Sequence, residues 1–192
     1  MFETSKWIWH KNLTGENITC NFRTCFQAQA GTEGRLAVSA QHFFRVFVNG
    51  VEVGGLSSPA PSVFTKRMRY LEYDISPFLQ KGENVLAFTV LYLGGEGQNR
   101  TRGIPCLIFD CALTSNGHTS HFGSDESCRC RAQTGYAQNL PLREPRRLTG
   151  STRFDPSLEE KGWKLPGFSD SHWEKAVISP ANLLQLPLMR QE

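Results

Sequence analysis

Apolar and polar residues alternate along several short segments of the chain, which is the pattern of half-buried β-strands. The clearest case is segment 45–53, where β-forming residues alternate on both sides of Asn49-Gly50. An Asn-Gly pair tolerates positive φ at both central positions of a type I′ turn, the turn that joins two strands most tightly. The pattern therefore predicts a β-hairpin with Asn49 and Gly50 at its tip.

Further elements are predicted around this hairpin. Segments 35–40 and 68–74 have the composition of strands, and Ser76-Pro77 follows the second of them. A capping Ser before a Pro at the first helical position predicts one helical turn, which ends before Gly82.

Segment 85–93 is apolar at both even and odd positions. Because successive side chains of a strand point to opposite faces, such a segment predicts a strand buried on both faces in the middle of a sheet. A second apolar strand is expected over 104–113, and shorter ones at 127–131 and 152–155.

These patterns together predict an all-β fold, an antiparallel two-sheet jelly-roll β-sandwich. No segment has the period of a long amphipathic helix with caps at both ends. With 192 residues the chain is large enough for one substantial core. We expect a single domain over residues 1–179, with a closing segment at 151–179, and an exit linker at 180–192 toward an absent downstream domain.

Charge and hydropathy exclude several classes of protein. The formal net charge is +3, and the short basic clusters at 66–69 and 143–147 lack interleaved aromatic residues, so we expect no nucleic-acid partner. The longest apolar run, 85–93, is about half the length of a membrane-spanning helix. No basic region followed by an apolar block opens the chain, so we expect no membrane contact and a cytoplasmic location.

The six cysteines are expected to be reduced thiols that pack as small apolar residues. The alternating pattern over residues 18–26 predicts a strand with Cys20 and Cys25 on opposite faces, so these two cannot bridge each other, and Cys106 and Cys111 have the same odd separation. Cross-strand pairing between other cysteines stays open as an alternative.

One group of potential metal ligands occurs within thirteen residues, namely His118, His121, Cys128 and Cys130. Structural zinc sites usually pair ligands two to four positions apart at both ends, and Cys128-x-Cys130 does not fit that spacing. We therefore expect no metal and no other cofactor.

Sequence motifs of catalysis are also missing. The chain has no G-x-S-x-G, no H-E-x-x-H and no G-x-x-x-x-G-K-[ST]. Glycoside hydrolysis needs two carboxylates that face each other across a sugar cleft, and no pair of Asp or Glu residues is singled out here. A Cys–His pair that meets only in the fold remains open, but we expect no catalytic residues.

Several motifs, in order along most of the chain, resemble the N-terminal β-sandwich of bacterial α-L-rhamnosidases and related large glycosidases. They are Lys6-Trp7-Ile8-Trp9, Asn21-Phe22-Arg23-Thr24-Cys25-Phe26, the 47–54 hairpin, Tyr70-x-x-Tyr73-Asp74-Ile75-Ser76, Leu79-x-x-Gly82-Glu83-Asn84-Val85, and the tail from Phe154 through Trp163 to Trp173. The chain departs from the family at Cys128, where a Trp is usual, which argues against sugar stacking by that position.

The resemblance implies a galactose-binding-like jelly roll that precedes further domains of the same polypeptide, including a helical barrel with the catalytic carboxylates. It therefore implies a non-catalytic accessory domain of a glycoside hydrolase, structural in role, with a weak carbohydrate contact as a further expectation. The alternative is an autonomous carbohydrate-binding, lectin-like module.

Two places are candidates for a carbohydrate contact. The glycine-rich loop 94–103 holds Glu96, Asn99 and Arg102, whose side chains can hydrogen-bond sugar hydroxyls. Trp163 and Trp173 offer rings on which a sugar could stack, with packing at the end of the sandwich as the alternative role.

Overall fold

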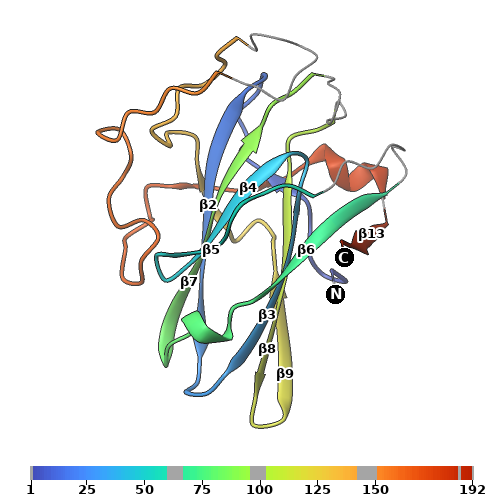
Figure 1. Ribbon diagram of the computed structural model, residues 1–192, viewed down its shortest axis with the longest axis vertical. Helices are drawn as coiled ribbons and strands as arrows, with labels where there is room; N and C mark the ends of the chain where they lie inside the picture. Colours follow the sequence, from blue (N-terminus) through green and yellow to red (C-terminus); the bar gives the residue numbers. More distant parts are fainter. Residues whose placement is uncertain (1, 60–66, 96–102, 142–150, 186, 192) are drawn as a thin grey trace.

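The computed structural model describes residues 2–59, 67–95, 103–141, 151–185 and 187–191, which form two packed β-sheets (Figure 1). The first sheet has the strand order β11 (Glu174–Lys175), β10 (Arg129–Arg131), β2 (Ile18–Ala28), β7 (Gly82–Tyr92), β4 (Phe43–Val48) and β5 (Val51–Ser57). The second has the order β12 (Val177–Ile178), β1 (Ile8–Trp9), β8 (Leu107–Ser115), β3 (Glu33–Ala40), β6 (Met68–Asp74) and β13 (Leu188–Arg190), and β9 (His118–Gly123) also pairs with β8. The expected β-sandwich is confirmed.

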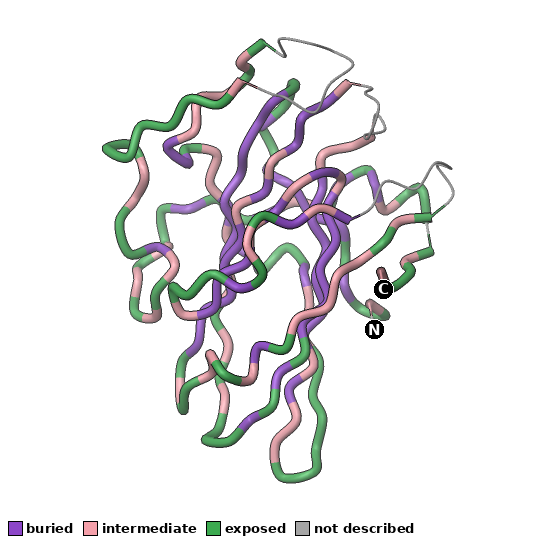
Figure 2. The backbone as a smooth tube through the Cα atoms, viewed as in Figure 1, coloured by how far each residue is buried: buried purple, intermediate pink, exposed green. Residues whose placement is uncertain are grey.

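Strand β7 lies in the middle of the six-stranded sheet, between β2 and β4, as its two-sided apolar pattern predicts. Leu86, Phe88 and Val90 face the core between the sheets. Val85 and Ala87 point to the outer face and pack in a second apolar cluster. Figure 2 shows the buried residues concentrated along these central strands, whereas the loops are largely exposed.

The Asn-Gly hairpin is confirmed. Asn49 and Gly50 join β4 to β5 with φ angles of 49° and 85°, as a type I′ turn requires. The Asn49 side chain also binds the start of β7, because its Oδ1 accepts from the Val85 amide at 2.8 Å and its Nδ2 donates to Asn84 Oδ1 at 2.8 Å. Asn84 is fully buried, so these bonds couple the hairpin tip to the centre of the sheet.

Several local predictions need correction. The helical turn exists as the 3₁₀ helix η1 (Ser76–Phe78), but its N-cap is Ile75, and Ser76 instead donates to Asp74 Oδ1 at 2.6 Å. Segment 152–155 forms only an isolated bridge between Phe154 and Tyr136, because it lies outside both sheets.

The segment expected as an exit linker is folded against the sandwich. Residues 180–184 form the 3₁₀ helix η2 (Pro180–Leu184), and Ala181 is buried against Trp7 and Ile108 on the outer face of the seven-stranded sheet. Strand β13 then pairs in parallel with β6. Regular structure therefore continues to Arg190 instead of stopping at residue 179.

Candidate functional site

The structure separates the predicted site residues. Glu96, Asn99 and Arg102 lie outside the described residues, so their role stays a prediction. Trp163 and Trp173 are only 2% and 3% exposed. They pack against each other, with ring centroids 5.6 Å apart, and against Phe47, Val85 and Ala87 of the sheet. Neither ring presents a free face to a sugar. Both tryptophans therefore have the alternative role, which is packing against the sandwich.

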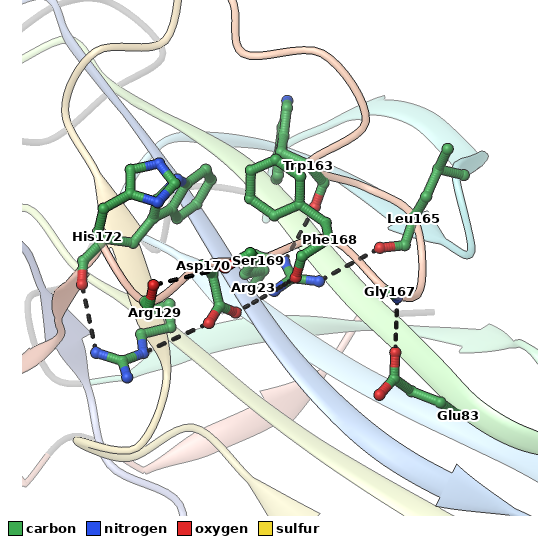
Figure 3. Close-up of polar contacts among 12 residues, drawn as sticks. Arg23, Glu83, Arg129, Trp163, Leu165, Gly167, Phe168, Ser169, Asp170 and His172 are labelled. Carbon is green, nitrogen blue, oxygen red and sulfur yellow. Dashed lines mark hydrogen bonds and ion pairs between the residues drawn. The ribbon is translucent and has the colours of Figure 1, made fainter.

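The closing segment is held by the buried guanidinium of Arg23, at the centre of Figure 3. Arg23 lies on the outer face of β2 and is 1% exposed. It forms an ion pair with Asp170, and its Nε donates to the Trp163 carbonyl at 3.0 Å. It donates more weakly to the carbonyls of Leu165 and Phe168. The charge is thus compensated, and four bonds fix the loop across the sheet.

The carboxylates of this segment also have partners. Glu159 accepts from the Trp163 indole at 3.2 Å and from Lys164 at 3.1 Å. Glu160 accepts from the Trp173 indole at 3.0 Å, forms an ion pair with Arg131 and lies 2.8 Å from His172 Nε2, within hydrogen-bond distance. The two carboxylates orient the indoles and the loop, so their charges have a structural role.

The exposed aromatic surface of the described chain lies elsewhere, at Tyr136 and Phe154. Phe154 is 42% exposed, and its ring centroid lies 4.7 Å from that of Tyr136, with the rings tilted by 46°. We call this pair the aromatic ridge. It stands at the end of the six-stranded sheet that the closing tryptophans leave uncovered.

The ridge is rigidly built. The Ala137 amide donates to the Arg153 carbonyl at 2.9 Å and the Asp155 amide to the Gly135 carbonyl at 2.8 Å, so two segments brace each other. Gly135 has a φ of 83°, which glycine adopts without strain. A Cβ at this position would lie 2.6 Å from the Phe154 ring, so any larger residue would disturb the aromatic pair.

The segment that carries Tyr136 is anchored to β2 by a single side chain. Gln138 Oε1 accepts from the Thr19 amide at 2.7 Å, and its Nε2 donates to the carbonyls of Thr19 and Ala132 at 2.9 and 2.8 Å. On the other side, Ser157 donates twice to Asp155 Oδ1, which holds the pKa of Asp155 below its usual value. Hydrogen bonds on both sides therefore hold the two segments that carry the ridge.

Two hollows flank the ridge and share Tyr136 and Ala137 as lining residues. The smaller, of about 190 Å³, lies over the outer face of the sheet, where Thr19, Thr89, Arg45 and Leu56 line it. The larger, of about 720 Å³, is lined by the 132–138 and 153–158 segments. Its size falls within the range of about 300–1,000 Å³ that is usual for small-ligand sites.

The potential metal ligands are scattered in the structure. His118 and His121 lie on β9 with exposed side chains, whereas Cys128 and Cys130 are buried in the core. Among the residues that the structure describes, no three His, Cys, Asp or Glu side chains gather as metal ligands would. No described helix is long and apolar enough to cross a membrane.

All six cysteines are unpaired, and Cys25 is the exposed one among them. Burial raises the pKa values of Cys111 and Cys128 to about 12, and those of Cys20 and Cys106 also rise strongly. These thiols stay protonated at neutral pH, where the thiolate is the nucleophilic form.

Sequence reasoning missed the aromatic ridge. Tyr136 and Phe154 are 18 positions apart, and the sequence pattern places Phe154 in a short strand at 152–155. The available signal was a lone aromatic residue in the polar stretch 151–161, which offers few apolar neighbours to bury it.

The sequence matches the family model of the α-L-rhamnosidase N-terminal domain over residues 30–191. An α-L-rhamnosidase of Alteromonas sp. (strain LOR) is 25% identical over 166 residues, which are 80% of this chain but 17% of that protein. The GH78 family rhamnosidase of Bacillus sp. GL1 superposes with a TM-score of 0.82 and 26% identity, over 97% of this chain and 20% of its own. The chain thus spans about a fifth or less of these two relatives.

The fold also resembles that of a lectin. The lectin from Pleurotus ostreatus, solved in complex with GalNAc, superposes with a TM-score of 0.56 and 20% identity, over 90% of this chain and 42% of its own. At that identity the likeness concerns the fold alone.

Proposed function

Because the chain belongs to the α-L-rhamnosidase N-terminal domain family, we propose that it serves as a non-catalytic accessory domain of a larger α-L-rhamnosidase-type glycoside hydrolase. The observation that carries this proposal is the share of the relatives that it covers, 17% of one rhamnosidase and 20% of another. Most of a relative's length, and with it the room for a catalytic domain, lies outside the matched region.

The use of the carboxylates supports the same proposal. A glycosidase needs one carboxyl group as acid and a second as nucleophile or base, both facing the sugar. In the closing segment, Glu159, Glu160 and Asp170 instead bind cations and indole N–H groups. Asp110 accepts from the Phe2 amide and Ser5 on the second sheet.

The partner that we propose is another domain of the same polypeptide. Two neighbouring apolar side chains on η2, Leu183 and Leu184, are 84% and 53% exposed. Adjacent exposed apolar side chains on a surface helix are a suitable contact for such a domain.

The proposal predicts that this chain alone does not hydrolyse an aryl α-L-rhamnoside above the buffer rate. Release of the aryl group is measured with the purified chain, and a complete α-L-rhamnosidase serves as positive control. Hydrolysis that disappears when a single carboxylate of this chain is mutated would overturn the proposal.

An autonomous lectin-like module is the second candidate, and the aromatic ridge favours it. An accessory domain and a lectin can share a sugar site, so binding alone does not separate them. The discriminating measurement is the length of the natural polypeptide on an immunoblot: an accessory domain migrates as part of a chain several times larger.

A further inference from the structure

We propose that the aromatic ridge of Tyr136 and Phe154 binds a glycan of at least two pyranose units, one unit in each of the two flanking hollows. The inference deepens the proposed function, because an accessory domain of a glycosidase gains from holding the substrate chain. It assigns the contact to residues outside loop 94–103 and outside the two tryptophans.

The exposed ring of Phe154 is the first argument. Among the exposed large apolar side chains of the described chain, Phe154 is the one aromatic residue. An exposed ring loses the stabilisation that its burial would bring, about 1.5–3 kcal/mol. Here it is also held in one position by a backbone bridge and by Tyr136. A fixed, exposed ring suits the apolar face of a pyranose.

Polar groups beside the ridge supply the second argument. The structure shows no hydrogen bond of the Tyr136 hydroxyl or the Arg153 guanidinium among the described residues, and Arg153 is exposed whereas Tyr136 is half-buried. They are donors placed next to an apolar face, which is the combination that orients a sugar. Thr19 and Thr89 add hydroxyl-bearing side chains in the smaller hollow.

The charges indicate a neutral glycan. In the smaller hollow, Arg45 is paired with Glu52 at 3.2 Å. In the larger hollow, the carboxylate of Asp155 lies two positions from Arg153 in the same lining segment. Neither hollow has an excess of positive charge that would select a uronic acid.

The length of the ligand follows from the geometry. Because Tyr136 and Ala137 line both hollows, the ridge separates two adjoining spaces, and a ligand in one continues into the other. The backbone hydrogen bonds of the ridge hold the two hollows at a fixed position relative to each other. Little conformational entropy is therefore lost on binding. A disaccharide should therefore bind more tightly than a monosaccharide.

The test is an NMR titration of the whole chain at millimolar concentrations of rutinose, a rhamnosyl-glucose, with L-rhamnose and cellobiose for comparison. We expect the largest amide shifts in residues 132–138 and 153–158, and tighter binding of rutinose than of L-rhamnose. Phe154→Ala should weaken rutinose binding about tenfold, the contribution of a good stacking contact. Tyr136→Phe should weaken it less, because the ring remains.

Leu183→Ala is the matched control, since it removes an exposed apolar side chain from η2, on the other sheet. It should leave rutinose binding unchanged, and thermal unfolding should show that both variants are folded. Shifts confined to other residues, no shifts with any probe, or equal binding by Phe154→Ala would overturn the ridge assignment. None of these results affects the accessory role, which the hydrolysis assay tests separately.

Discussion

Single backbone positions decide whether the central hairpin can form. Gly50→Val should lower the free energy of unfolding by about 1–2 kcal/mol, because a β-branched residue is strained at φ of 85°. The added Cβ would also lie 2.6 Å from the end of the Leu165 side chain, which is exposed and can move away. Urea unfolding followed by tryptophan fluorescence measures the change. Gly50→Asn is the control and should cost less, since Asn tolerates the left-handed region.

Thiol reactivity is the second property set by single residues. With a disulfide-exchange reagent at pH 8, we expect one thiol, the exposed Cys25, to react in the folded protein as the fast phase, although partial burial raises its pKa above the usual value. The other five should react only after unfolding, since they are buried and the reagent cannot reach them. Cys25→Ser should abolish the fast phase, and a fast phase that survives this change would contradict the assignment.

Among the loops, the closing segment depends on one buried cation. Arg23→Ala should lower the free energy of unfolding by about 3–5 kcal/mol, because it leaves Asp170 and three carbonyls without their donor. Limited proteolysis should then cut within 163–173, where the parent protein resists.

Arg129→Ala is the comparison for Arg23→Ala. Arg129 contacts the same carboxylate at 3.8 Å, but its side chain is 30% exposed, so its loss should cost less than about 1 kcal/mol. Equal effects of the two substitutions would show that burial of Arg23 does not set the strength of the contact.

The strands were predictable where a local pattern determines them. Asn49-Gly50 and the two-sided apolar run of β7 each encode their structure within about ten residues. Strand β13 was missed because three residues carry no period, and only the neighbouring edge of β6 makes them a strand. The ridge was missed for a similar reason, since a bridge between Tyr136 and Phe154 exists only after both segments are anchored.

At the scale of the whole molecule, the outer face of the six-stranded sheet is divided in two. The half near Val85 and Ala87 is covered by the closing tryptophans, and the half near Thr89 lies open beside the ridge. In the sequence of β7, Thr89 is the one polar residue of the apolar run 85–93. The sequence does not show which segment covers each half, because the closing segment is far from β7 along the chain.

Contacts between the first strand and the segment 177–182 affect the order in which the fold forms. The Trp7 amide donates to Asn182, which lies 175 positions later in the chain, and β1 completes its pairing only with β12. On the ribosome, β1 can therefore complete its pairing only after residues 177–182 have emerged. Contacts between such distant segments form slowly, because the entropy of closing a long loop is lost before they stabilise anything. Until residues 177–178 have emerged, the nascent chain thus keeps an open edge at β1, and this edge is where premature association would begin.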